Sequence, residues 1–364
     1  MEKVKVAVIG AGSFGKNHAR AWSELQKEGS PVELVAVVDA DLARATEHAG
    51  KYGVAAYSSV KELLQKARPE AASVAVPTIH HAAVARELME AGVDVLIEKP
   101  IAATIEQADE IVELAAKHNR VGMVGHLERF NPAVRATIPL INHPMFFEVH
   151  RLSVFTPRAL DVDVVLDLMI HDIDIVLSFV DSPVKEIRAV GIPILSPKVD
   201  ICNVRVEFES GCVANLTASR VSTERVRKLR FFQPKQYISV DYGRQDVLVF
   251  NVGKPGAELK KDEPKKDVPI DPRPGVFDSA ELLAARQAFS GAAVLAQAGI
   301  SMTKPAVAQE EPLKAELKAF LRAVRERSRP EVTLEQGRRA LALGLEILRQ
   351  VQQHAEKLGL RGST

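Results

Sequence analysis

The first 125 residues alternate short apolar runs with longer segments whose apolar positions recur at helical spacing. The apolar runs predict strands at residues 4–9, 33–39, 72–76, 94–98 and 121–125. The intervening segments predict helices at residues 17–28, 41–52, 60–67, 80–91 and 105–119. Gly92 is placed to end the fourth helix and Thr104 to cap the fifth. Strands that alternate with helices are typical of βαβ units, so residues 1–125 are expected to form an α/β domain with a mostly parallel sheet.

After about residue 145, strand patterns follow one another with few helices between them. The expected strands are 146–154, 186–191, 203–209, 213–220, 229–233, 237–241 and 245–251, and one helix, 162–179, interrupts them. Helical patterns return at 311–327 and 334–357. This succession predicts an α+β domain over residues 126–310, built on a large, mostly antiparallel sheet. Residues 311–364 are expected to pack back toward the first domain, and the charged, proline-rich stretch 254–274 to be an exposed loop.

Composition narrows the class of protein. The 364 residues suffice for about two domains, and 48 Lys+Arg against 47 Asp+Glu argue against a general nucleic-acid binder. The two cysteines are too few for a disulfide scaffold and lack metal-ligand spacing. The most apolar long segment, 162–180, contains four aspartates and a histidine, so it is no membrane span. We therefore expect a soluble, cytoplasmic protein without a membrane or nucleic-acid partner.

The first strand runs into the pattern Gly10-x-Gly12-x-x-Gly15 and then into a helix. In a dinucleotide-binding turn, the first glycine allows the tight bend, the second lets a pyrophosphate approach the backbone, and the third permits close packing of helix and strand. Asp39 ends the second strand, where a carboxylate suits a ribose 2′-hydroxyl and repels a 2′-phosphate. The sequence therefore predicts a Rossmann domain that binds NAD in preference to NADP, although Arg44 could weaken that preference.

Two further predicted strands end in residues that are candidates for ligand binding or catalysis. One is followed by Pro77, Thr78 and His81, and the other ends in Glu98-Lys99-Pro100. The carboxyl ends of parallel strands form the ligand-binding edge of such sheets. A lysine there could polarise a substrate hydroxyl or exchange a proton with it, although an isolated lysine before a proline can equally be a surface residue.

The helical segment 162–179 places Asp167 four residues before His171, so the two are expected to share a face. A carboxylate one turn from an imidazole can fix its tautomer and raise its basicity, which suits acid–base chemistry. The spacing is also compatible with metal ligation or with ordinary salt bridges. Because the sequence offers no further nitrogen or sulfur ligands nearby, no metal is expected.

Residues 125–132 follow the last strand of the first domain and should border the cleft between the domains. Arg129 and Asn131 in this segment suit a phosphorylated or hydroxyl-rich ligand, or they stabilise a linking turn. Arg151 and Arg158 lie on or beside the predicted sheet and are candidates for binding a diphosphate, as are Arg220 and Arg225. Each of these arginines could equally be a structural surface residue.

Together these motifs resemble the Gfo/Idh/MocA oxidoreductases, a family named for glucose–fructose oxidoreductase and inositol dehydrogenase. The resemblance rests on the glycine turn, Pro77-x-x-x-His81, the Glu98-Lys99-Pro100 motif with Ala91-Gly92 before it, Asp167-x-x-x-His171, and the late Glu311-Pro312-Leu313. It covers nearly the whole chain except 254–308, and it departs at Thr78, where many members carry Asn. It implies a Rossmann domain followed by a large-sheet domain that binds substrate and mediates oligomerisation.

The resemblance implies that Lys99, Asp167 and His171 form the catalytic group, and it leaves open whether Lys99 or His171 accepts the proton. The expected cofactor contacts are Gly10, Gly12, Ser13, Phe14, Gly15, Asp39, Pro77, Thr78, His81, Glu98 and Lys99. The expected substrate contacts are Arg129, Asn131, Arg151 and Arg158.

Residues 125–132 and 164–174 look like family members that oxidise the 3-hydroxyl of UDP-N-acetylglucosamine. Those enzymes make a 3-keto sugar nucleotide for later transamination, for instance toward amino-sugar lipid A in lipopolysaccharide biosynthesis or toward other surface glycans. A dehydrogenase of a free polyol such as inositol, a keto-sugar reductase and a non-catalytic NAD(H)-sensing protein are the alternatives. The family also implies a homodimer or homotetramer formed through the exposed sheet.

Overall fold

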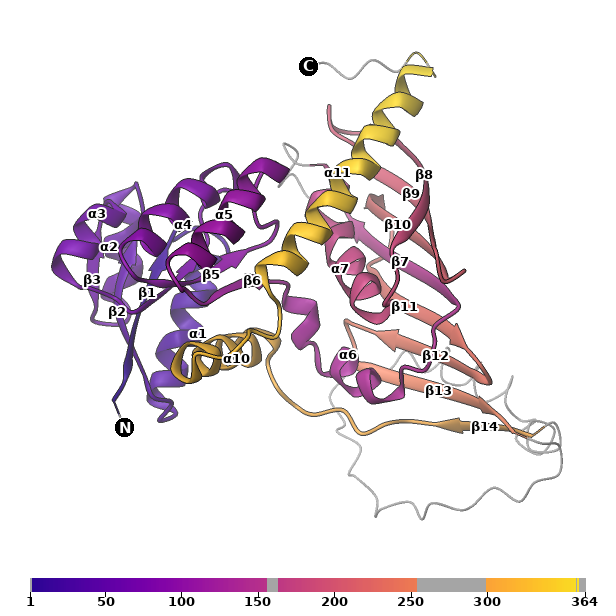
Figure 1. Cartoon of the computed structure of the whole chain (residues 1–364), viewed down its shortest axis with the longest axis horizontal. Helices are drawn as coiled ribbons and strands as arrows, with labels where there is room; N and C mark the ends of the chain where they lie inside the picture. The colour runs from indigo at the N-terminus through magenta and orange to yellow at the C-terminus, as the bar shows by residue number, and fades with distance from the viewer. Residues whose placement is uncertain (1, 156–162, 254–298, 358, 360–364) are drawn as a thin grey trace.

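The computed structural model describes residues 2–155, 163–253, 299–357 and 359, which form two sheet domains (Figure 1). The expected loop at 254–274 and the candidate residue Arg158 lie outside the described residues. Among the helices of the described ranges, none combines the length and the apolar character that a membrane span requires.

The N-terminal domain is built on a six-stranded parallel sheet with the order β3-β2-β1-β4-β5-β6. Its strands are β1 (Val4–Ile9), β2 (Val32–Val38), β3 (Ala55–Tyr57), β4 (Ala71–Val74), β5 (Asp94–Glu98) and β6 (Gly122–Gly125). Its helices are α1 (Gly15–Lys27), α2 (Leu42–Gly50), α3 (Val60–Lys66), α4 (His81–Glu90) and α5 (Ile105–Lys117). The strand order is that of a Rossmann domain, as predicted.

Local sequence explains where these helices begin and end. The side chains of Asp41, Ser59 and Thr104 accept backbone hydrogen bonds at the starts of α2, α3 and α5. Gly92 follows α4 with a φ of +86°, a conformation that glycine adopts without strain. Among the described strands of this parallel sheet, the sequence patterns missed β3, which has three residues and therefore too short an apolar run to recognise.

The C-terminal domain has an eight-stranded sheet with the order β14-β13-β12-β11-β7-β10-β9-β8. The strands are β7 (Phe146–Val154), β8 (Val184–Ile192), β9 (Ile201–Phe208), β10 (Val213–Ser222), β11 (Val226–Gln233), β12 (Gln236–Asp241), β13 (Asp246–Val252) and β14 (Ile300–Thr303). Among the described strands only the central β7–β10 pair is parallel, so the sheet is mostly antiparallel, as predicted.

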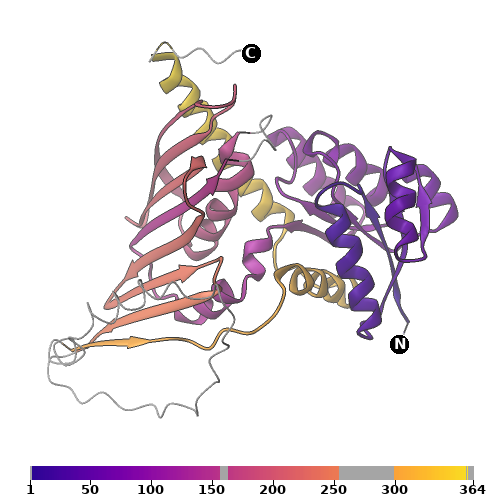
Figure 2. The same ribbon diagram turned by 180° about the vertical axis from the view of Figure 1, so that it is seen from behind.

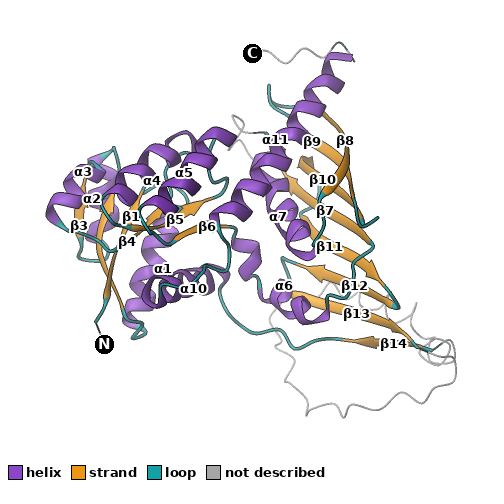
Figure 3. Cartoon of the chain, in the orientation of Figure 1, coloured by secondary structure: helices purple, strands orange, loops and turns teal. Residues whose placement is uncertain are grey.

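The helices α7 (Ile170–Phe179) and α11 (Leu334–Lys357) cover the face of this sheet that is turned toward the first domain (Figure 3). Phe147 on β7 and Phe231 on β11 are fully buried beneath them, with ring centroids 5.4 Å apart. The short α6 (Pro132–Thr137) packs beside β12 and β13. One sheet face therefore carries the core of the second domain, and the described helices leave the other face open.

The predicted helix 162–179 differs from the observed structure at its beginning. Residues Val165–Met169 form a π-helical turn, and the regular helix α7 starts only at Ile170. Such turns widen a helix locally and are frequent at functional sites. Asp167 lies in this turn, whereas His171 lies in the first turn of α7.

The C-terminal segment returns to the first domain before it reaches the second. Helix α10 (Pro312–Glu326) packs on α1, and the two helices lie side by side in views from the front and from behind (Figure 2). Helix α11 then starts against β6, where Leu334 occupies the space beside Gly122 and Val124 the space beside Gly337. The rest of α11 crosses the second sheet as far as β8, so this segment joins the two domains.

Candidate active site

A cavity of about 760 Å³ lies along the carboxyl edge of the parallel sheet and reaches the π-helical turn before α7, where Leu166 and Asp167 line it. Its lining includes most of the predicted cofactor contacts: Gly10, Gly12, Ser13, Phe14, Asp39, Pro77, Thr78, His81, Glu98 and Lys99. Arg44, Ser58, Ser59 and His80 also line it and were not named as contacts from the sequence.

The three glycines of the N-terminal turn meet different steric demands. A Cβ at Gly10, whose φ is +96°, would lie 2.5 Å from the Ala75 carbonyl oxygen, and one at Gly15 would lie 1.7 Å from the carbonyl oxygen of Gly10. A Cβ at Gly12 would have no atom within 4 Å, although Gly12 lines the cavity. Gly10 and Gly15 are therefore required for packing, whereas the free space at Gly12 is what a closely approaching pyrophosphate needs. The turn fits a bound dinucleotide.

Asp39 is held at the end of β2 by the backbone. One carboxylate oxygen accepts a hydrogen bond from the amide of Ala11 at 2.7 Å, and the other accepts from the amide of Asp41 at 2.9 Å. Arg44 extends from α2 and lies 3.4 Å from the same carboxylate, with about half of its side chain exposed. These hydrogen bonds fix the orientation of the Asp39 carboxylate in the cavity, and the Arg44 guanidinium lies against it.

Lys99 reaches across from β5 to the second domain. Its Nζ donates a hydrogen bond to the Asp167 carbonyl oxygen at 2.6 Å and lies 3.6 Å from the Asp167 carboxylate. Burial lowers the pKa of Lys99, and the negative charges of Asp167 and Glu98 oppose that shift. The structure thus brings Lys99 and Asp167 together at the inner end of the cavity.

His81 connects two of the strand ends that form the cavity. Its ring nitrogens lie 2.9 Å from the Val76 carbonyl oxygen and 3.0 Å from the Pro100 carbonyl oxygen. Burial lowers the pKa of His81, so the ring is neutral at pH 7 and donates to one of the two carbonyls at a time. His81 thereby ties the segment after β4 to the proline that follows Lys99.

His171 lies beside this group, and its buried Nδ1 has no hydrogen-bond partner in the part of the chain that the structure describes. Its pKa is lowered well below the usual value, first by burial and then by the positive charges of Lys99 and Arg151. The sequence suggested that Asp167 orients the histidine, but the Asp167 carboxylate lies next to Lys99 instead. An ammonium group attracts a carboxylate more strongly than a neutral imidazole does.

The predicted substrate residues are engaged with neighbouring side chains. Arg129 donates to Asp174 at 2.8 Å, and Arg151 donates two hydrogen bonds to Asp172, at 2.7 and 2.9 Å. The Asn131 side chain caps α6 and donates to the carbonyl oxygen of Tyr242. Because all of these side chains are mostly buried, they connect the linker after β6 to α7 and to the second sheet.

Arg227 on β11 is an additional basic residue near His171 that sequence reasoning missed. It pairs across the sheet with Arg151, and its positive charge contributes to the lowered pKa of His171. Within the described part of the chain it has no hydrogen-bond or ion-pair partner, because Arg151 already occupies Asp172 and Glu128. Arg227, Leu229 and Phe231 stand at every second position of β11, so their side chains lie on the same face of the sheet. Because Leu229 and Phe231 are apolar and buried, this spacing is the signal that would have placed Arg227 on the inner face of the sheet.

The strand order, the glycine turn and the cavity define a two-domain protein with a Rossmann domain for dinucleotide binding. Comparison with family models identifies residues 4–126 as the NAD-binding Rossmann fold of an oxidoreductase family and residues 142–238 as a GFO/IDH/MocA C-terminal domain. The chain therefore belongs to the Gfo/Idh/MocA family of oxidoreductases.

Among its relatives is the UDP-N-acetylglucosamine 3-dehydrogenase of Acidithiobacillus ferrooxidans, which is 36% identical over 72% of this chain and 83% of the relative. The solved structure of that enzyme superposes with a TM-score of 0.80 and covers 97% of this chain and 99% of its own, at 31% identity. The inositol 2-dehydrogenase of Rubrobacter xylanophilus is 30% identical over 52% of this chain and 56% of the relative. A Bordetella pertussis dehydrogenase, solved with NADH and UDP-GlcNAcA, shares the fold at 17% identity and a TM-score of 0.71, covering 97% of each chain.

Proposed function

We propose that this protein is an NAD-dependent dehydrogenase that oxidises the 3-hydroxyl of UDP-N-acetylglucosamine to the 3-keto sugar nucleotide. The observation that carries the proposal is its similarity, in sequence and over nearly the whole fold, to an enzyme of that activity. The cavity adds chemical support, because it joins the glycine turn to Lys99 and Asp167.

NAD would be held by the glycine turn, with its pyrophosphate near Gly12 and its adenosine ribose near Asp39. The Asp39 carboxylate favours a ribose 2′-hydroxyl over a 2′-phosphate, and its contact with Arg44 reduces the charge that Arg44 could offer to a phosphate. Pro77, Thr78, His81 and Glu98 would border the nicotinamide end. When bound, NAD accepts the hydride from the sugar carbon.

The proton of the oxidised hydroxyl goes to His171 in this mechanism. The lowered pKa of His171 keeps its imidazole unprotonated at neutral pH, so the ring can accept a proton. Burial lowers the pKa of Lys99, and the negative charges of Asp167 and Glu98 oppose that shift. In this mechanism Lys99 is the protonated group that stabilises the developing alkoxide. Asp167 holds the lysine in place through its backbone carbonyl oxygen.

The anionic part of the substrate would lie against the second domain. Arg227 presents a guanidinium that no described carboxylate neutralises, which suits a diphosphate. Arg129, Asn131 and Arg151 would contribute polar contacts from positions that their ion pairs and hydrogen bonds already fix. Arg158 remains a candidate on the grounds of sequence alone.

The protein would assemble as a homodimer or homotetramer through the open face of the second sheet. A row of aromatic rings crosses that face, with centroids 5.8 Å apart for Phe146 and Phe232, 4.9 Å for Phe232 and Tyr237, and 5.4 Å for Tyr237 and Phe250. Met302, which is half exposed, extends the row on β14. Such an apolar patch marks an interaction site, and light scattering of the purified protein would reveal a monomer if this is wrong.

A second candidate function is oxidation of a free polyol, favoured by the similarity to inositol 2-dehydrogenases. The two are distinguished by measuring NADH formation with UDP-N-acetylglucosamine, myo-inositol and glucose in parallel. A second series contains 2-oxoglutarate as oxidant, in case the reduced cofactor stays bound. Activity on the sugar nucleotide alone supports the proposal, whereas activity on inositol alone replaces it with the second candidate.

A further inference from the structure

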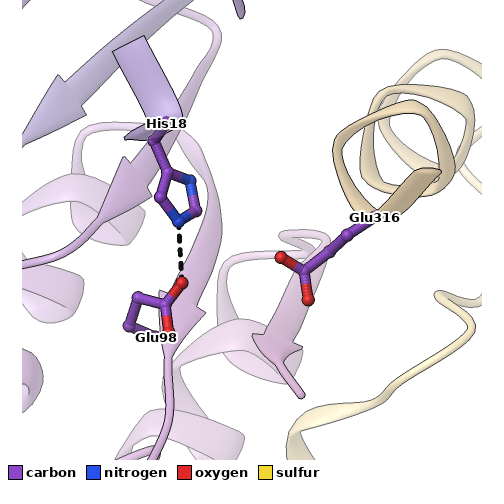
Figure 4. A group of neighbouring side chains, drawn as sticks. All are labelled: His18, Glu98 and Glu316. Carbon is purple, nitrogen blue, oxygen red and sulfur yellow. Dashed lines mark hydrogen bonds and ion pairs between the residues drawn. The ribbon is translucent and has the colours of Figure 1, made fainter. Parts of the chain in front are cut away.

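A buried cluster of three ionisable side chains lies behind Lys99, and only Glu98 among them takes part in the mechanism described above. His18 comes from α1, Glu98 from β5 and Glu316 from α10 (Figure 4). One nitrogen or oxygen atom from each side chain lies within 4.8 Å of the other two. The cluster joins the helix after the glycine turn, the strand that carries Lys99 and the C-terminal segment.

The three side chains of this cluster differ in whether they have hydrogen-bond partners. His18 Nε2 and a Glu98 carboxylate oxygen are hydrogen-bonded at 2.7 Å, and the other Glu98 oxygen accepts from the amide of Lys99 at 3.3 Å. Glu316 is fully buried, and neither of its oxygens has a hydrogen-bond partner among the described residues. Figure 4 shows its carboxyl group directed at the His18–Glu98 pair. An isolated buried carboxylate is so unfavourable that the group must gain either a proton or a cation.

The geometry favours a proton over a metal ion. Zinc binds nitrogen and oxygen ligands at about 2.0–2.2 Å, which separates two ligands of a tetrahedral site by about 3.4 Å. His18 and Glu98 are closer than that, at hydrogen-bond distance, so a proton already fills the space between them. We propose that Glu316 is a neutral carboxylic acid at neutral pH and donates its proton toward Glu98, completing a buried chain that positions Glu98 and Lys99.

The charged groups around Glu316 support its neutral, protonated state. Burial raises the pKa of Glu316 well above its usual value, and the negative charge of Glu98 adds to the effect. The charged groups on the neighbouring elements are already paired: Glu128 with Arg151, Arg129 with Asp174, Lys314 with Glu24 and Glu28, and Arg20 with Glu24 and Glu311. None of these pairs supplies the counter-charge that an ionised Glu316 would need.

The buried chain of His18, Glu98 and Glu316 has a direct connection to the candidate active site. Glu98 lines the cavity, and its negative charge raises the pKa of Lys99. Gly125 leaves room for this side chain, because a Cβ there would lie 3.1 Å from a Glu98 oxygen. A hydrogen bond from Glu316 would restrain Glu98 from the side opposite the cofactor. Glu316 is thus a positioning residue. This role rests on the proposed dehydrogenase function only for tests that measure activity.

The decisive experiment is infrared spectroscopy of the whole protein without substrate. Wild type minus Glu316→Gln at pH 7 is expected to show the carbonyl band of a protonated carboxylic acid. Wild type minus Glu326→Gln, which changes an exposed glutamate on the same helix, is expected to lack it. Absence of the band in the first comparison overturns the proposal, as does a stoichiometric metal ion in the purified protein that Glu316→Gln removes.

Ligand binding tests the positioning role without any assumption about the sugar substrate. Glu316→Gln keeps a neutral donor and is expected to bind NAD as wild type does. Glu316→Leu removes the donor and is expected to weaken NAD binding about tenfold, the size of a lost hydrogen bond to a charged group. Equal affinity of wild type and the folded Glu316→Leu variant, by calorimetry, would show that Glu316 does not position Glu98. Failure of sugar oxidation leaves both tests unaffected.

Discussion

The two sheets of this protein bury their residues in different ways. Every residue of β4, β5 and β6 in the first domain is buried, because helices cover both faces of a parallel sheet. In the second domain, β9 and β10 largely alternate buried and partly exposed residues, because the described helices cover one face only. In the first sheet, side chains contribute to the cavity mainly where strands end in turns. In the second, a side chain anywhere along a strand can face the cleft.

This difference determines how each domain contributes to the site. The first domain supplies backbone turns and strand-end residues such as Gly12 and Lys99, whose spacing along the chain is regular. The second lines the cavity with Leu166 and Asp167. In the proposed mechanism it also contributes His171 and Arg227, from a helix and a strand whose orientation depends on packing. We therefore expect substitutions in the first domain to affect the cofactor and the chemistry, and those on β11 to affect the substrate.

The largest effect is expected from replacing the residues at which the domains meet. Lys99→Met or His171→Asn should reduce turnover about 10²–10⁴-fold, because each removes a group that holds or accepts a proton in the reaction. NAD affinity, measured by calorimetry, should change far less. Lys66→Met, at an exposed site on α3, is the control. Normal turnover in the Lys99→Met/His171→Asn double variant would refute the assignment of the catalytic group.

A comparison of two glycines separates packing from cofactor binding within the first domain. Gly15→Ala forces a Cβ against the Gly10 carbonyl oxygen and should lower the free energy of unfolding by about 1–3 kcal/mol. Gly12→Val places its side chain in free space, so it should weaken NAD binding while changing stability by less than about 0.5 kcal/mol. Chemical denaturation and calorimetry measure the two quantities. Unchanged NAD affinity in Gly12→Val would contradict the assignment of the pyrophosphate site.

The pH dependence of kcat/KM tests which residue accepts the proton. Because the pKa of His171 is well below its usual value, the base is already deprotonated at neutral pH. Activity should therefore be level around pH 7 and fall, about tenfold per pH unit, only below that lowered pKa. If Lys99 were the base instead, activity would rise as the pH increased through the lowered pKa of the lysine.

The smallest effect is expected at the second sheet. Arg227→Gln should raise KM for the sugar nucleotide about tenfold, with kcat nearly unchanged, because it removes a charge-assisted contact to the diphosphate. Arg230→Gln, on the opposite face of the same strand, serves as the control. Equal KM values for wild type and Arg227→Gln would place the diphosphate elsewhere.

Several features of the fold could be predicted because they depend on neighbours in the chain. The parallel sheet follows from alternating apolar runs and helical patterns, and Thr104 and Gly92 mark helix ends by local hydrogen bonding and backbone conformation. Short elements were missed, among them β3 and α6, because each offers too few positions for a period to emerge.

By itself, the sequence determined the Rossmann domain, the glycine turn and the proximity of Lys99 to the cofactor edge, since the alternation of strands with helices and the chemistry of a turn are local properties. Only the tertiary structure decided that Asp167 pairs with Lys99 rather than His171, and that Glu316 faces Glu98. It also decided that carboxylates neutralise Arg151, whereas no carboxylate of the described residues pairs with Arg227. These pairings join residues that are far apart in the chain or that compete for one partner. Burial and charge in the folded protein select among them, and neither can be read from spacing along the chain.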